Sequence, residues 1–208
     1  MAQDTSAYTN LIGAGWAVNG APLIPGGGTI PLSGTYYFVD SVRGSDGNQG
    51  TFDSPLATLQ QAISNCTAAV GDCIVLKAGH AETISAAGGV TVSKSGIYII
   101  GLGTGADRPT FSFSATASTF LISAANVAIG NILGVSAVDL CVSPFSITAA
   151  GCSLGMPNLP VEYQDPSSSL QAIRAVLGDT SADKLNINLV YRGITSGGTS
   201  PVNVVRLN

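Results

Sequence analysis

The chain has 208 residues, of which 45% are hydrophobic and only 10% charged, and its formal net charge is −4 at pH 7. This composition is not that of a disordered chain, and a charged fraction well under the roughly 25% of an average domain suggests that other subunits cover much of the surface. Lys and Arg do not cluster, which argues against nucleic-acid binding because phosphate groups are neutralised by several neighbouring cations. No signal peptide and no run of ~18 apolar residues appears, so neither secretion nor a membrane span is predicted.

Residues 1–35 are predicted to form an extended arm. Glycine and proline recur along them and preclude long regular structure. A flexible linker would be polar, whereas large apolar side chains are spaced along this segment. The arm therefore gains order either by lying on a neighbouring molecule or by folding back over its own domain. The residues predicted to make these contacts are Leu11, Ile12, Trp16, Leu23, Ile24 and Ile30.

The domain proper, residues 36–208, is predicted to begin with a strand at 36–39 and a turn-rich loop at 40–50. Ser54 can cap a helix with Pro55 in its first turn, and apolar residues at helical spacing extend that helix over about residues 55–68. The helix has one apolar stripe to bury. We therefore predict that it caps the open end of a repetitive core.

One short pattern occurs three times, at residues 92–99, 122–129 and 147–154, and a weaker copy lies at 181–187. Each full copy has a Gly or Asn, at positions 96, 126 and 151, which suits a corner in the left-handed backbone conformation. In the middle copy, Val127 and Ile129 are expected to point inward and Ala128 outward. Repeats at spacings of roughly 20–50 residues indicate a solenoid.

Short strands are predicted throughout residues 70–155, which should form the coils. No Asn-Gly or Asp-Gly hairpin signal separates them, and this favours a parallel β-helix over a sandwich. Residues 156–208 are expected to form a projecting loop and a closing coil, with residues 170–177 either helix or strand. The expected strands are 73–76, 83–84, 90–92, 97–100, 110–113, 119–122, 127–129, 138–142, 145–148, 152–154, 185–189 and 202–205.

Residues that could carry chemistry are few. Glycoside hydrolysis needs two carboxylates at a set separation, and the four candidates occupy different positions of the repeat, so they should not share a cleft. Asp107 and Arg108, which are adjacent in a loop, are expected to form a local ion pair with each other. His80 is the only histidine and is interpreted as a turn residue, with an acid–base pair to Glu82 as the alternative. The four candidate carboxylates are Asp72, Glu82, Asp107 and Asp139.

The four cysteines, Cys66, Cys73, Cys141 and Cys152, have no zinc-binding spacing and are expected to be reduced and packed in the interior, although a Cys66–Cys73 bridge stays open. The segment from Asp46 to Asn48 lacks the later Glu of a calcium loop. The sequence therefore predicts no catalytic residue, no cofactor and no metal site, and it argues against an enzyme.

Three stretches, residues 37–40, 44–51 and 54–63, resemble the entry segment of right-handed parallel β-helix proteins of the pectate-lyase-like class. Residues 71–84 resemble the version of that segment found in virion proteins of tailed bacteriophages. The resemblance covers about residues 36–155. It implies an all-β fold, a right-handed parallel β-helix of about 4–5 coils with an N-terminal capping helix and an extended N-terminal arm.

Tailspike depolymerases of this class are much longer and carry acidic clefts, whereas this chain is a short knob with an apolar arm. It is most similar to a capsid decoration or cement protein. The resemblance then implies a homotrimer on the outer capsid surface of the virion, made in the bacterial host cytoplasm, with the major capsid protein as its partner. The alternative is a tail fibre or tailspike-type adhesin that binds, with or without cleavage, host surface polysaccharide through loops 101–109 and 157–169.

Overall fold

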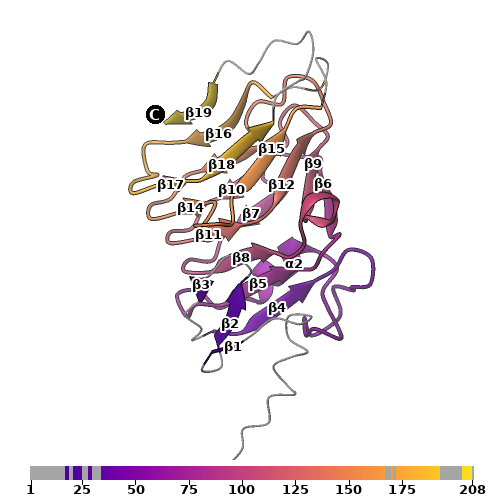
Figure 1. The fold of residues 1–208 in the computed structure, drawn as a ribbon. Helices are drawn as coiled ribbons and strands as arrows, with labels where there is room; N and C mark the ends of the chain where they lie inside the picture. The colour runs from indigo at the N-terminus through magenta and orange to yellow at the C-terminus, as the bar shows by residue number, and fades with distance from the viewer. Residues whose placement is uncertain are drawn as a thin grey trace, which may run out of the picture.

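The computed structural model describes residues 17–18, 21–24, 28–29, 34–166, 170, 172–192 and 203–207. Within them, parallel strands visit three sheets in rotation, and the predicted parallel β-helix is confirmed (Figure 1). Sheet A contains β4 (Tyr36–Val39), β5 (Cys73–Leu76), β8 (Tyr98–Gly101), β11 (Ala128–Gly130), β14 (Ser153–Leu154) and β17 (Asn186–Ile187). Sheet B contains β6 (Ala81–Ile84), β9 (Thr110–Phe113), β12 (Leu133–Ser136), β15 (Val161–Gln164) and β18 (Leu189–Arg192). Sheet C contains β7 (Val90–Val92), β10 (Phe120–Ile122), β13 (Phe145–Ile147), β16 (Arg174–Gly178) and β19 (Asn203–Leu207).

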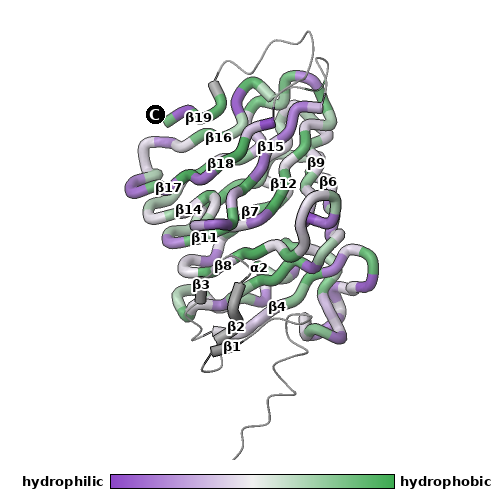
Figure 2. Tube along the Cα trace, in the orientation of Figure 1, coloured by the Kyte–Doolittle hydropathy of each residue, from purple (hydrophilic) through white to green (hydrophobic). Residues whose placement is uncertain are grey.

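The interior between the three sheets is apolar. Alternate residues of each strand point into it, so that Val127 and Ile129 are fully buried while Ala128 between them is partly exposed, as predicted. Figure 2 shows hydrophobic residues recurring along the stacked strands and hydrophilic residues at several of the turns between them. Aromatic rings stack along the column, with the centroids of Phe111 and Phe120 5.4 Å apart and those of Phe113 and Phe145 5.6 Å apart.

The repeated pattern forms the corner that leads from sheet C back to sheet A, here called the C–A corner. Its central residues Gly96, Asn126 and Gly151 have φ values of +65°, +58° and +70°, as the sequence predicts. Backbone N–H groups at this position donate to the next coil: Gly96 to the carbonyl of Ala125 at 3.0 Å and Asn126 to that of Ala150 at 3.0 Å. The corner therefore continues the inter-coil ladder through the turn.

The N-terminal segment contains three short strands, β1 (Ala17–Val18), β2 (Ala21–Ile24) and β3 (Gly28–Thr29), which form an antiparallel sheet. Figure 1 draws this small sheet at the end of the solenoid that carries β4. Of the predicted contact residues, Leu23 and Ile24 lie on β2 opposite Thr29 and Gly28. The others, Leu11, Ile12, Trp16 and Ile30, lie outside the described residues.

The helix is shorter than predicted. It runs as α2 over Leu59–Asn65, and its N-cap is Thr58, whose hydroxyl accepts from the backbone N–H of Gln61 at 3.2 Å. The expected start at Ser54 and Pro55 is wrong because Leu56 joins β4 instead, donating its N–H to the carbonyl of Phe38 at 2.9 Å. The buried face of α2 nevertheless packs against β4, β5 and β7, so the helix caps the interior.

Two strand assignments differ from expectation, and one that the sequence left open is settled. The strand expected at 138–142 is a corner, because Leu140 has a φ of +56°, and β12 lies earlier at Leu133–Ser136. The loop expected after Pro157 contains β15, which is buried. The ambiguous segment 170–177 holds a strand, β16. The corners between sheets A and B and between sheets B and C vary in length from coil to coil. The repeated pattern covers only the C–A corner, so it could not predict where the strands after the other corners begin.

Gly134 on β12 offers a test of interior packing. A Cβ atom there would lie 2.9 Å from both Phe145 Cε2 and Tyr163 Cδ2. We predict that Gly134→Val lowers the free energy of unfolding by roughly 1–3 kcal/mol through overpacking. The matched control is Gly47→Ala, whose Cβ would meet only Ser45 Oγ at 3.9 Å and which should stay within about 0.5 kcal/mol of wild type. Urea denaturation measures both, and equal effects would contradict the packing account.

Candidate functional site

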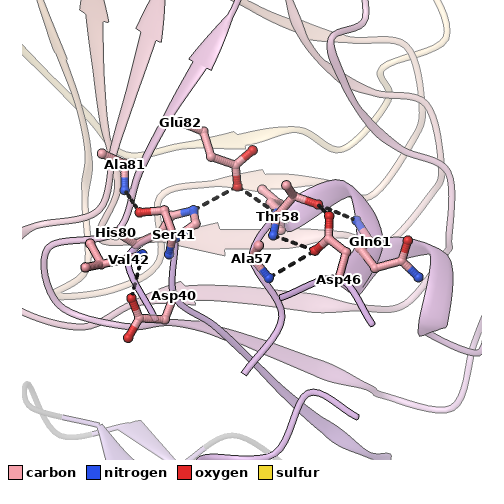
Figure 3. A network of polar contacts seen from close by, with 11 residues as sticks. Asp40, Ser41, Val42, Asp46, Ala57, Thr58, Gln61, His80, Ala81 and Glu82 are labelled. Carbon is pink, nitrogen blue, oxygen red and sulfur yellow. Dashed lines mark hydrogen bonds and ion pairs between the residues drawn. The ribbon is translucent and has the colours of Figure 1, made fainter. Parts of the chain in front are cut away.

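A polar network surrounds His80, at the corner between β5 and β6 (Figure 3). The His80 side chain is fully buried, and its Nε2 lies 2.8 Å from Glu82 Oε1. Its Nδ1 accepts from the backbone N–H of Ser41 at 3.0 Å, so in the neutral ring the proton sits on Nε2 and is donated to Glu82. The pairing that the sequence left as an alternative is therefore present, although it is enclosed.

The rest of the network fixes backbone. Glu82 Oε1 also accepts from the N–H of Leu59, the first residue of α2, at 2.7 Å. Asp46, once weighed as part of a calcium loop, accepts from the backbone N–H groups of Ala57 at 3.0 Å and Thr58 at 2.9 Å. The Ser41 hydroxyl accepts from the N–H of Ala81 at 2.9 Å. These contacts, drawn in Figure 3, tie the 40–58 segment to α2 and to the first coil.

Of the other predicted carboxylates, Asp72 and Asp139 accept from backbone N–H groups, whereas Asp107 is exposed. Asp72 is 2% exposed and accepts from the N–H groups of Thr35 at 2.6 Å and Thr67 at 2.7 Å. Asp139 accepts from the N–H of the adjacent Leu140 at 3.0 Å. Asp107 ends a single 3-10 turn, η1 (Gly105–Asp107), where its side chain is exposed. Asp72 precedes β5, Asp107 precedes β9 and Asp139 follows β12, so the three belong to different coils.

The expected Asp107–Arg108 ion pair is wrong, because Arg108 pairs with Glu162 instead. Glu162 lies on the outer face of sheet B and is 6% exposed. Its Oε1 contacts Arg108 Nη1, and its Oε2 lies 2.7 Å from Arg192 Nη2. Arg108 Nε donates to Asn131 Oδ1 at 2.9 Å. The sequence does not predict this cluster. It predicts a loop where β15 lies, and without the strand the outward direction of the Glu162 side chain does not follow.

The sequence proposed loops 101–109 and 157–169 as one binding face; β15 occupies part of the second, and Asn131 links the residues before that strand, 155–160, to the first. Its side-chain amide donates to the carbonyls of Gly101 at 2.8 Å and Gly103 at 2.9 Å. Its backbone N–H donates to the carbonyl of Leu159 at 3.3 Å. Loops 101–109 and 155–160 therefore meet at the corner between sheets A and B, beside Arg108 and Glu162.

All four cysteines are free and buried. Burial raises the pKa of the Cys66 thiol to about 12 and that of Cys141 to about 11, and it raises the pKa values of Cys73 and Cys152 as well. No Cys66–Cys73 bridge forms. Over the described ranges, no three His, Cys, Asp or Glu side chains gather as a metal site, and no helix is long and apolar enough to cross a membrane.

Comparison with known proteins supports the β-helix fold. No family model and no curated protein matches the chain. A solved structure titled "Rhamnogalacturonan lyase" matches with a TM-score of 0.50 and 16% sequence identity, over 84% of this chain and 50% of that one. The chain thus spans about half the length of that structure. A likeness at this identity establishes the β-helix architecture and leaves the activity open.

Glu82 provides the test of the His80 network. We predict that Glu82→Ala lowers the free energy of unfolding by about 1–3 kcal/mol, because it leaves the Leu59 N–H and the His80 Nε2–H without an acceptor. Asp107→Ala, which removes an exposed carboxylate, is the control and should change stability by less than about 0.5 kcal/mol. Chemical denaturation followed by circular dichroism compares the two. A Glu82 variant as stable as its control would rule out the anchoring role.

Asp165 gives a pH prediction. It is 1% exposed and accepts from the Ala172 N–H at 3.0 Å and the Tyr191 hydroxyl at 2.7 Å, and burial raises its pKa above the ordinary 3.8. A raised pKa in the folded state means that the contribution of Asp165 to stability is complete below the unfolded-state pKa and is lost as the pH rises through the folded-state value. The free energy of unfolding of wild type should therefore fall, relative to Asp165→Asn, from pH near 3.8 toward neutrality. Parallel profiles for the two proteins would refute this.

Proposed function

We propose that this protein is a structural component of a tailed-bacteriophage virion, a capsid decoration or cement protein that binds and stabilises the major capsid shell as a homotrimer. Within the β-helix resemblance of residues 36–155, the similarity of residues 71–84 to virion proteins of tailed bacteriophages supports the setting. The short solenoid with an apolar segment ahead of it supports decoration over a spike. The partner is the major capsid protein, on the outer capsid surface.

The observation that carries this proposal is the partial exposure of the last coil of the described residues. Its inward residues Ile187, Leu189 and Tyr191 are partly exposed, whereas Leu154 and Tyr163, their counterparts in the preceding coil, are fully buried. Among the described residues, β17, β18 and β19 are each the last strand of their sheet. Solenoids need a cover at each end; α2 covers the first coil, and no described helix covers the last. Partly exposed inward side chains of this kind suit a protein that works inside an assembly.

The contacts of the polar side chains also support a structural role. The acid–base groups that the sequence singled out hold backbone N–H groups, as His80, Glu82 and Asp72 do. Groups engaged in this way serve the scaffold. This supports a structural role over catalysis.

Adhesion to the shell is assigned to the N-terminal arm, with Leu11, Ile12, Trp16, Leu23, Ile24 and Ile30 as its contact residues. Burial of apolar surface stabilises a contact by about 25 cal/mol per Å2, so a Trp and several Leu or Ile side chains supply several kcal/mol per arm before ordering costs. In a homotrimer, three arms bind together and their effects multiply.

A variant of the arm tests the proposal. We predict that Leu11→Asp combined with Trp16→Asp weakens binding to shells stripped of this protein by at least about a hundredfold, with the folded domain intact. Val42→Asp is the matched control, because Val42 is 81% exposed in the 40–50 loop and should bind as wild type does. Cosedimentation with shells measures binding, and light scattering should give three times the chain mass of 20.8 kDa. Full decoration by the arm variant would contradict the assignment.

A tail fibre or tailspike-type adhesin that binds, and possibly cleaves, host surface polysaccharide is the second candidate. The observation in its favour is the meeting of loops 101–109 and 155–160 beside Arg108 and Arg192, whose side chain is 57% exposed. A guanidinium at such a corner suits an acidic glycan. Binding of surface polysaccharide that is lost in Arg192→Ala, with or without release of cleaved sugar, would favour this candidate.

A further inference from the structure

The outer face of sheet A is apolar and buried at β4, β5 and β8. Phe38, Cys73, Val75 and Ile100 form a second cluster, separate from the interior, with exposures of 4%, 0%, 6% and 2%. Their strand neighbours, such as Ile74, belong to the interior cluster, so these four side chains point out of the solenoid. An outward face that is this apolar needs a cover.

Described residues supply that cover over two parts of the face. Phe52 packs edge-on against Phe38 with ring centroids 5.4 Å apart, and Lys77 holds it by donating to its carbonyl at 2.7 Å. Leu159 and Met156 lie over Gly130 of β11, the strand next to Ile100, where an added Cβ would be 3.0 Å from the Leu159 Cβ. Phe52 covers the cluster at β4, and Leu159 and Met156 cover it at β11.

A column made by Tyr36, Cys73 and Tyr98 is left over. The register places these three residues side by side on β4, β5 and β8. Cys73 is completely buried, and the Tyr36 hydroxyl is buried with no hydrogen-bond partner. Burial also raises the pKa of both groups. Tyr36 and Tyr98 pack against the cluster that contains Cys73, and within the described part of the chain Tyr98 makes no ring contact with another aromatic residue.

The chain enters this column from its own N-terminal side. Thr35 directly precedes β4, and its N–H donates to Asp72 Oδ1 at 2.6 Å while its carbonyl accepts from the N–H of Cys73 at 2.9 Å. Residues before Gly34 therefore start beside Tyr36 and Cys73. This preceding stretch is rich in apolar residues, including Leu23, Ile24 and Leu32.

We propose that residues 17–33 of the same chain, which contain β1, β2 and β3, cover the column formed by Tyr36, Cys73 and Tyr98. A strand of four residues such as β2 is about 13 Å long, which spans three neighbouring strands spaced about 4.8 Å apart. With Leu23, Ile24 and Ile30 assigned to the column, Leu11, Ile12 and Trp16 are the arm residues left to contact the capsid shell. The inference narrows the proposed set of contact residues, and because it concerns contacts within one chain it can fail while the capsid proposal holds.

Thiol labelling tests the proposal, since Cys73 lies on the outer face whereas Cys66, Cys141 and Cys152 lie in the interior cluster. The full chain, a variant lacking residues 1–16 and a variant lacking residues 1–33 are treated with N-ethylmaleimide at neutral pH, and each modified cysteine is identified by peptide mass spectrometry. We expect Cys73 to react at least about tenfold faster only when residues 17–33 are removed, with the other three thiols still protected.

Three results would overturn the proposal. Slow labelling of Cys73 in the variant without residues 1–33 would mean that something else covers it. Rapid labelling in the full chain would mean that nothing does. Protection that disappears on dilution of the full chain would assign the cover to the arm of a neighbouring molecule.

A second variant keeps the test decisive if the larger truncation unfolds, which labelling of all four cysteines would reveal. Leu23→Asp combined with Ile24→Asp in the full chain places charge on β2 and should accelerate Cys73 labelling alone. Val42→Asp, at an 81% exposed site, is the control and should leave all four thiols protected. A β2 variant whose Cys73 stays as protected as in the control would also overturn the proposal.

Discussion

The whole solenoid depends on a corner that keeps the coils in register. At the C–A corner, Gly96, Asn126 and Gly151 turn the chain in the left-handed conformation and pass a backbone hydrogen bond to the next coil. Only Gly, and to a lesser degree Asn, adopts that conformation at low cost. Because the corner has the same length in these coils, each following strand of sheet A starts opposite its neighbour, and the inward side chains stack into one interior.

This corner explains what the sequence could and could not predict. The repeat was visible because a fixed length and a fixed backbone conformation restrict the residues, and it predicted the fold and the inward side of β11. The other two corners vary in length, so β12 and β15 were missed, and with β15 the outward position of Glu162 was lost. The helix start was misplaced because Leu56 pairs with β4, a tertiary contact that overrides the capping signal of Ser54.

The polar residues follow a common rule. His80, Glu82, Asp46 and Asp72 each accept hydrogen bonds from backbone N–H groups of distant segments. Their residue types suggested chemistry, but their surroundings make them anchors for the N-terminal loop and α2. The sequence raised the His80–Glu82 pair only as an alternative and could not place Ser41 or Leu59 beside it, since those contacts span about one coil of chain. These contacts anchor the first coil and the helix that caps it.

The central claim is that this solenoid decorates a capsid. It is tested most directly by the number of copies per virion relative to the major capsid protein, measured by quantitative mass spectrometry of purified particles. A decoration protein follows the symmetry of the shell, so the account predicts hundreds of copies, in a fixed ratio to the major capsid protein. A few to a few dozen copies, as expected for a tail component, would contradict it.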